Sequence, residues 1–199
     1  MIPGRRALHL CLLALLLAGV VGPNRSHALT PEKGRLLVAK EQLADPRFRD
    51  RVILLIQHDA QGSAGLVVNR PSRLLLSTLL PEGSSLAGQG MVLSYGGPVE
   101  PQTLLALVKV RSHPPEPADE VTDNLYVTGV GILDEWPGYA DEVVACRAFV
   151  GYTGWAPGQL DAEMQRGDWA VLPADEQSVF AAEGVRLWER LHEMSEEKR

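Results

Sequence analysis

The sequence has little cysteine, fewer basic than acidic residues and no long apolar run, and each shortage argues against a class of protein. Cys146 is the only cysteine after residue 28, so that part of the chain can form no internal disulfide. The 19 Lys and Arg residues are outnumbered by 25 Asp and Glu, and the net charge of −6 favours a surface that repels nucleic acid. The apolar run over residues 10–22 is short for a bilayer span.

The first 28 residues have the layout of a secretory leader. They contain Arg5 and Arg6, then the apolar run, then Ser26-His27-Ala28, which has small residues three and one before a possible cleavage point. We therefore expect residues 1–28 to be a signal peptide and the protein to be exported to the periplasm or the extracellular space. The alternatives are a retained anchor or a start assigned too early; in the second case the protein is cytoplasmic.

Removal of this leader would leave residues 29–199 as a single domain without a stable membrane span. These 171 residues are enough for one hydrophobic core. The leader takes three arginines and no acid with it, so 16 basic residues remain against 25 acidic ones, a net charge of −9. We therefore expect no nucleic-acid partner.

The most distinctive stretch lies in the last third of the chain. Residues 143–150 are rich in β-branched and aromatic side chains, which predicts a strand. The glycines of residues 151–154 predict an elbow, Pro157 suits the first turn of a helix, and Gly167 ends that helix. The glycines either serve chain geometry alone or place a helix N-terminus where it can hold an anion, although no phosphate-loop lysine follows.

The rest of the chain predicts further strands of ordinary length. Clusters of Gly, Pro and Asn separate the apolar segments, and residues 58–63 predict the turn of a hairpin. Residues 112–119, with three prolines, predict a surface loop, because proline cannot continue a ladder. The predicted strands cover residues 51–57, 65–69, 91–95, 104–110, 124–128 and 169–172.

Helices are predicted at fewer places. A leucine-rich segment that begins at Pro71 or Ser72 predicts a short helix ended by Pro81. Residues 132–141 are poor helix formers, so we expect a short or irregular element there. Residues 183–194 predict an amphipathic helix whose inward side chains are Leu187, Trp188, Leu191 and Met194. Strands in uneven order with helices of mixed length indicate the α+β class.

Four stretches carry a resemblance to a known family. They are GRLLVA with LADPRF at residues 34–48, His58 with GLVVNRP at 65–71, GGPV at 96–99, and GYTGWAPGQLDAE with GDW at 151–169. Together they resemble the AlgH/YqgE family of small bacterial proteins over residues 34–192. The resemblance implies a bent sheet closed into a pseudo-barrel with helices packed outside. The resemblance implies no settled activity. Most members of the family lack a leader, so the predicted signal peptide is a departure from the family pattern.

Few residues suggest chemistry. His58 beside Asp59 could act as a base or a metal ligand, but neighbours in an extended chain point to opposite sides and no further His or Cys cluster completes a metal site. The serine of Gly62-Ser63-Ala64-Gly65 lacks the spacing of a nucleophile elbow. We therefore assign no catalytic residue, metal or cofactor. Cys146 is expected to be a packed apolar side chain rather than a reactive thiol.

The distinctive residues shape a surface more than they supply chemistry, which favours a non-enzymatic binding or regulatory module with an unidentified ligand or protein partner. A hydrolase that uses His58 with Asp59, Tyr152 or Asn69 is the first alternative, and a transcriptional regulator is the second. The expected ligand or partner surface consists of His58, Asn69, Gly96, Gly97, Pro98, Gly151, Tyr152, Gly154, Trp155 and Gln159.

Overall fold

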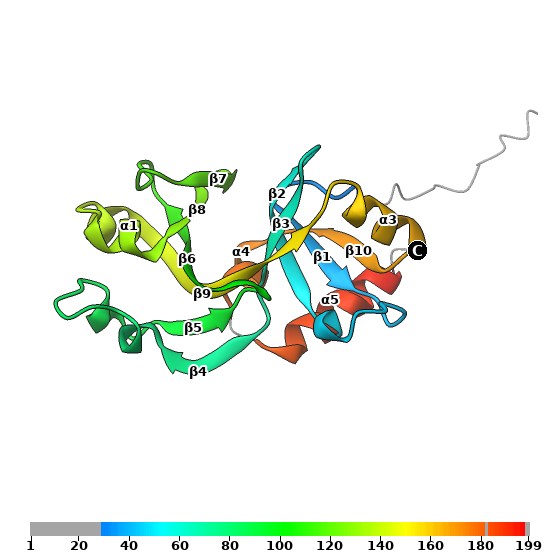
Figure 1. Ribbon diagram of the computed structural model, residues 1–199, viewed down its shortest axis with the longest axis horizontal. Coiled ribbons are helices and arrows are strands. Elements are labelled where there is room, and N and C mark those ends of the chain that lie inside the picture. The colour runs from blue at the N-terminus through cyan, green and yellow to red at the C-terminus, as the bar shows by residue number, and fades with distance from the viewer. Residues whose placement is uncertain (1–28, 182, 198–199) are drawn as a thin grey trace, which may run out of the picture.

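The computed structural model describes residues 29–181 and 183–197 (Figure 1). The predicted signal peptide lies outside this range. Among the described residues, no helix combines the length and the apolar character needed to cross a membrane.

The architecture is built on strands that pair mainly antiparallel. The pairing path runs β10-β1-β2-β3-β9-β6-β8-β7, with β4 attached to β5 and β5 parallel to β9. The strands are β1 (Arg35–Ala39), β2 (Val52–Asp59), β3 (Gly62–Val67), β4 (Pro71–Leu75), β5 (Val92–Tyr95), β6 (Val99–Val110), β7 (Asp119–Thr122), β8 (Leu125–Gly129), β9 (Val143–Trp155) and β10 (Trp169–Pro173).

The sheet bends strongly but does not close. Within the described residues, its pairing path ends at β7, which comes back to lie near β2 without pairing with it. Figure 1 shows the β2–β3 hairpin and the β7–β8 pair standing opposite each other, with the long strand β9 running through both halves of the molecule. The α+β class is therefore confirmed, and the bent sheet stays open on one side.

Helices cover the sheet at both ends. Figure 1 places α3 and α5 beside β1 and β10, and α1 at the opposite end beside β6 and β8. The helices are α1 (Val130–Glu135), α2 (Tyr139–Glu142), α3 (Gln159–Arg166), α4 (Glu176–Phe180) and α5 (Val185–Glu197), with 3-10 turns at Pro46–Phe48, Leu76–Thr78 and Ala87–Gln89. The short α1 and α2 confirm the expectation for residues 132–141.

Strands β1 and β2 are covered on both faces. In β1, Leu36 and Val38 join the core under α4 and α5, whereas Leu37 and Ala39 join the core under α3. This alternation follows from the two-residue period of a strand. A third core lies between β5, β6, β9 and α1. The predicted burial of Leu187 and Leu191 in α5 is confirmed, but the prediction for Met194 is wrong, because its side chain is 38% exposed.

The helix predicted after Pro71 is wrong. The segment forms strand β4, which pairs with β5, followed by the 3-10 turn Leu76–Thr78. Only Leu76 of the leucine run is fully buried, while Leu74 and Leu75 are 48% and 43% exposed. Pairing with a neighbouring strand has overridden the helix propensity of leucine.

The elbow predicted at residues 151–154 is also wrong. Strand β9 continues to Trp155, and Thr153 pairs with Gly65 of β3. Gly151, at φ 66°, bends the strand without ending it. Helix α3 begins at Gln159, and the predicted end at Gly167 is confirmed by its left-handed φ of 76°.

Candidate functional site

Three motif glycines form a backbone crossing between the β5–β6 turn and β9. They are Gly96 and Gly97 of the GGPV motif and Gly151 of the GYTGW motif. A Cβ on Gly96 would lie 2.1 Å from the carbonyl oxygen of Gly151, and a Cβ on Gly97 would lie 2.2 Å from that of Tyr152. The Gly96 N–H donates to Val150 O at 2.9 Å. These glycines therefore serve close backbone packing, and Pro98 and Gly154 lie exposed beside them.

Asn69 supports the backbone and does not lie on a binding surface. It is 2% exposed; its Oδ1 accepts from Val52 N–H at 3.0 Å, and its Nδ2 donates to Asp50 O at 2.8 Å. Both bonds satisfy main-chain groups at the start of β2. Asn69 therefore holds Asp50, a residue with a positive φ of 57°, in place.

Trp155 belongs to an aromatic cluster beneath α3. Its ring lies 6.2 Å from that of Trp169 and 6.5 Å from that of Phe48. The two indole N–H groups donate to the same oxygen of Glu163, at 2.9 Å and 2.8 Å. Gln159 donates to the other oxygen of Glu163 at 3.0 Å, so these motif residues fasten α3 to the sheet.

His58 is paired with a serine that the sequence did not single out as its partner. Its Nδ1 lies 2.8 Å from Ser63 Oγ, across the hairpin. The carboxylate of Asp59 is turned to other partners, because it accepts from the Gln57 side chain and from Gln61 N–H. The Gln57 amide, followed by that N–H, lowers the pKa of Asp59 below its usual value. No carboxylate in the described chain hydrogen-bonds to the imidazole.

Two adjoining cavities, each of about 420 Å³, lie between the β2–β3 hairpin and the β7–β8 pair. They share Ile56, Gln57, Asp119 and Val127, and together we call them the β2–β7 cleft. The first is otherwise lined by Ala64, Leu105, Pro117, Ala118, Thr128, Gly129, Ile132 and Tyr152, and the second by Lys33, His58 and Asp59. Of the ten predicted surface residues, His58 and Tyr152 line these cavities.

One wall of the cleft is an incompletely paired strand edge. Strand β1 pairs with β2 only from Val52 to Leu54, and Gly34 N–H then donates to Leu55 O at 2.8 Å. Beyond Leu55, the outer edge of β2 has no strand partner among the described residues, although β3 pairs with the inner edge as far as Asp59. An edge of this kind offers main-chain donors and acceptors to another chain.

The hairpin geometry indicates which groups point into the cleft. A two-residue loop, Ala60-Gln61, joins Asp59 to its partner Gly62. Hydrogen-bonded pairs alternate along an antiparallel ladder and begin next to such a loop, so the main chain of His58 faces outward. Its imidazole shares a cross-strand row with Ser63 and Trp155. His58 therefore contributes its backbone to the cleft.

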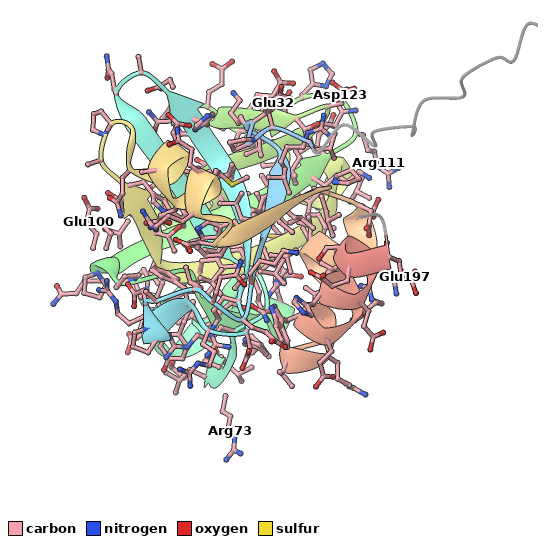
Figure 2. The ribbon with its side chains drawn as sticks, turned by 90° about the vertical axis from the view of Figure 1, so that its right-hand side faces the viewer. Glu32, Arg73, Glu100, Arg111, Asp123 and Glu197 are labelled. Carbon is pink, nitrogen blue, oxygen red and sulfur yellow. The ribbon has the colours of Figure 1, made fainter. Side chains whose placement is uncertain are left out.

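The cleft carries more negative than positive charge. Asp59 and Asp119 line it against one Lys33. Figure 2 shows Glu32 and Asp123 near each other at one edge of the molecule, in agreement with the approach of Gly34 to Thr122, although neither residue lines the two cavities. Tyr152 lies at the other end, where burial and then the nearby Glu100 raise the pKa of its hydroxyl. The side chains and the main-chain edge suit binding more than bond cleavage.

Cys146 is a thiol and not a thiolate, because burial raises its pKa to about 12. We expect iodoacetamide to label it at pH 8 about a thousandfold more slowly than an ordinary cysteine with a pKa of about 8.5. Peptide mapping separates Cys146 from Cys11, and the urea-unfolded chain is the control. Equal labelling rates in the folded and unfolded chains would contradict this assignment.

Known proteins are similar to this chain in sequence and in fold. A family described as AlgH-like (DUF179) matches residues 36–198. A UPF0301 protein of Rhodococcus jostii is 40% identical over 159 residues, which is 78% of each chain. A UPF0301 protein of Streptomyces coelicolor is 37% identical over 158 residues, which is 78% of this chain and 82% of the other.

Two solved structures superpose on most of the chain. The crystal structure of a Corynebacterium diphtheriae protein has a TM-score of 0.71 at 26% identity and covers 82% of this chain and 87% of the other. The solution structure of AlgH from Pseudomonas aeruginosa has a TM-score of 0.67 at 28% identity and covers 81% and 88%. With the family match over nearly the whole described region, these likenesses show that the chain belongs to the AlgH-like family.

Proposed function

We propose that this protein is a non-enzymatic binding or regulatory module that receives an extended segment of a partner protein in the β2–β7 cleft. The observation that carries the proposal is the outer edge of β2 beyond Leu55, which has no strand partner among the described residues and borders a cleft with cavities of about 420 Å³. An extended peptide adds to such an edge through main-chain hydrogen bonds, while alternate side chains enter pockets.

The cleft wall supplies both the main-chain hydrogen bonds and the apolar side-chain contacts that an added strand needs. The main chain of His58 provides the donor and acceptor that an added strand needs. Leu105, Val127 and Ile132 provide apolar surface in the first cavity. This apolar area stabilises a bound segment by removing its side chains from water.

The charges of the cleft favour a basic partner. Asp59 and Asp119 line the cavity that contains one lysine, so a segment with Lys or Arg among its apolar residues is complementary. The same charges disfavour nucleic acid, in line with the net charge of −6.

A designed peptide pair tests the proposal. The protein is titrated into a dye-labelled octapeptide of alternating lysine and valine, and the fluorescence anisotropy of the peptide gives its Kd; the labelled glutamate–valine peptide is the control. Asp119→Lys is expected to weaken binding of the lysine peptide by about fivefold or more, because it reverses an exposed charge at the cleft. Glu189→Lys makes the same charge change on an exposed face of α5 and is expected to leave the Kd within about twofold.

Equal affinities for the two peptides would remove the charge argument. Equal weakening by Asp119→Lys and Glu189→Lys would show that net charge, and not the cleft, governs binding.

A second candidate function rests on the pair formed by His58 and Ser63. A hydroxyl 2.8 Å from an imidazole nitrogen is the first requirement for an activated serine nucleophile. The absence of a bonded carboxylate on the imidazole among the described residues weighs against a complete triad. A screen with ester, phosphate and peptide substrates would support this hydrolase only if Ser63→Ala and His58→Ala each abolish turnover.

A further inference from the structure

Arg147 of β9 is a cation buried away from the cleft. It is 7% exposed. Its guanidinium donates to Val179 O at 2.7 Å and to Ser94 Oγ at 2.9 Å, and its Cζ lies 5.1 Å from the centre of the Phe149 ring. All of these partners are electrically neutral.

The positive charge of Arg147 has no acidic partner in the described part of the chain. None of the ion pairs found there includes Arg147, and burial alone lowers its pKa to about 10. The carbonyl of Val179 belongs to α4, but a five-residue helix offers only a small dipole. Buried charges in proteins are normally paired, so this position favours an anion.

A cavity of about 390 Å³ lies next to this arginine, and it is lined by Arg147, Met91, Val92, Val144, Phe180 and Tyr139, among others. Val92 and Val144 are 46% and 48% exposed, so its mouth is apolar and open to solvent. Its volume falls in the range of about 300–1,000 Å³ that is common for small-molecule sites.

We propose that this cavity binds a monocarboxylate with an apolar body, whose carboxylate contacts the guanidinium of Arg147. Arg147 is the one basic residue among the described residues that line the cavity, so the site matches a single negative charge. A planar guanidinium pairs with a carboxylate through two parallel hydrogen bonds. The apolar body lies against Met91, Val92 and Phe180. This site uses β5 and the beginning of β9, and it is independent of the β2–β7 cleft.

The test compares octanoate with octanamide, which has the same apolar body without the charge. Isothermal titration and backbone chemical shifts are recorded on the purified protein. We expect octanoate to bind at least about tenfold more tightly than octanamide, as a charge-assisted pair predicts, with shifts centred on Val92 and Val144. Arg147→Met is expected to lower the affinity for octanoate to the affinity for octanamide.

A second variant protects the test against misfolding of Arg147→Met. Val144→Glu changes an exposed residue at the cavity mouth. Its added negative charge is expected to weaken the binding of octanoate by about fivefold or more, and to weaken the binding of octanamide less. Equal affinity for the two ligands, unchanged octanoate binding in Val144→Glu, or shifts confined to other surfaces would overturn the proposal.

Discussion

Replacing Gly96 with alanine is expected to lower the free energy of unfolding by about 3 kcal/mol or more, because the new methyl group enters a fully packed backbone crossing. Its Cβ would lie 2.1 Å from the carbonyl oxygen of Gly151. That oxygen is backbone and cannot rotate away as a side chain can. The crossing must open, which strains the pairing of β5 with β9 on which the third core depends.

Gly88→Ala is the matched control for Gly96→Ala. A Cβ on Gly88 meets nothing within 4 Å, so the change is expected to alter stability by less than about 0.5 kcal/mol. Urea unfolding followed by circular dichroism measures both variants. If Gly96→Ala were as stable as Gly88→Ala, the crossing would be looser than described.

Glu163→Ala is expected to lower the free energy of unfolding by roughly 2–4 kcal/mol, because it leaves two indole donors without an acceptor. Trp155 and Trp169 are 6% and 4% exposed, so little water can replace the lost carboxylate. The change also removes the contact between Gln159 and Glu163. The fluorescence of the two tryptophans is expected to change in the folded state.

Gln165→Ala in the same helix separates loss of the carboxylate from loss of helix propensity. Gln165 is exposed and alanine is the better helix former, so the change is expected to be neutral within about 0.5 kcal/mol. Equal stability of the two variants would show that Glu163 does not hold α3 to the sheet.

Elements specified by local pattern could be predicted from the sequence. The apolar run that begins at Val52 is a strand, as predicted, and its side chains are buried on both faces. Gly167 ends α3 because its left-handed φ suits glycine. The prediction of an amphipathic helix near the C-terminus is likewise confirmed by α5.

Elements specified by distant pairing could not be predicted. The glycines of the GYTGW motif look like a turn, yet β9 continues through them because β3 and β6 supply partners. The four-residue β7, Asp119–Thr122, was only partly within a predicted loop and has no strong apolar alternation. It is a strand because β8 pairs with it.

The candidate site was harder to predict than the fold. The cleft joins Ile56, Leu105, Asp119 and Tyr152, which are far apart in sequence and belong to no common motif. Gly96, Gly97 and Gly151 are the most conspicuous residues of the motifs, but they serve close backbone packing and not binding. The contact of Ser63 with His58 could have been inferred from the hairpin register had the two-residue loop been recognised.

Amide hydrogen exchange of the β2 edge tests the account most directly. The hairpin register turns the His58 N–H away from β3, and among the described residues it has no strand partner on its other side. It is therefore expected to exchange rapidly in the free protein and at least about tenfold more slowly when the lysine–valine peptide is bound. The Leu54 N–H, within the fully paired part of β2, is the internal reference. A bound peptide that leaves His58 exchange unchanged would contradict strand addition at this edge.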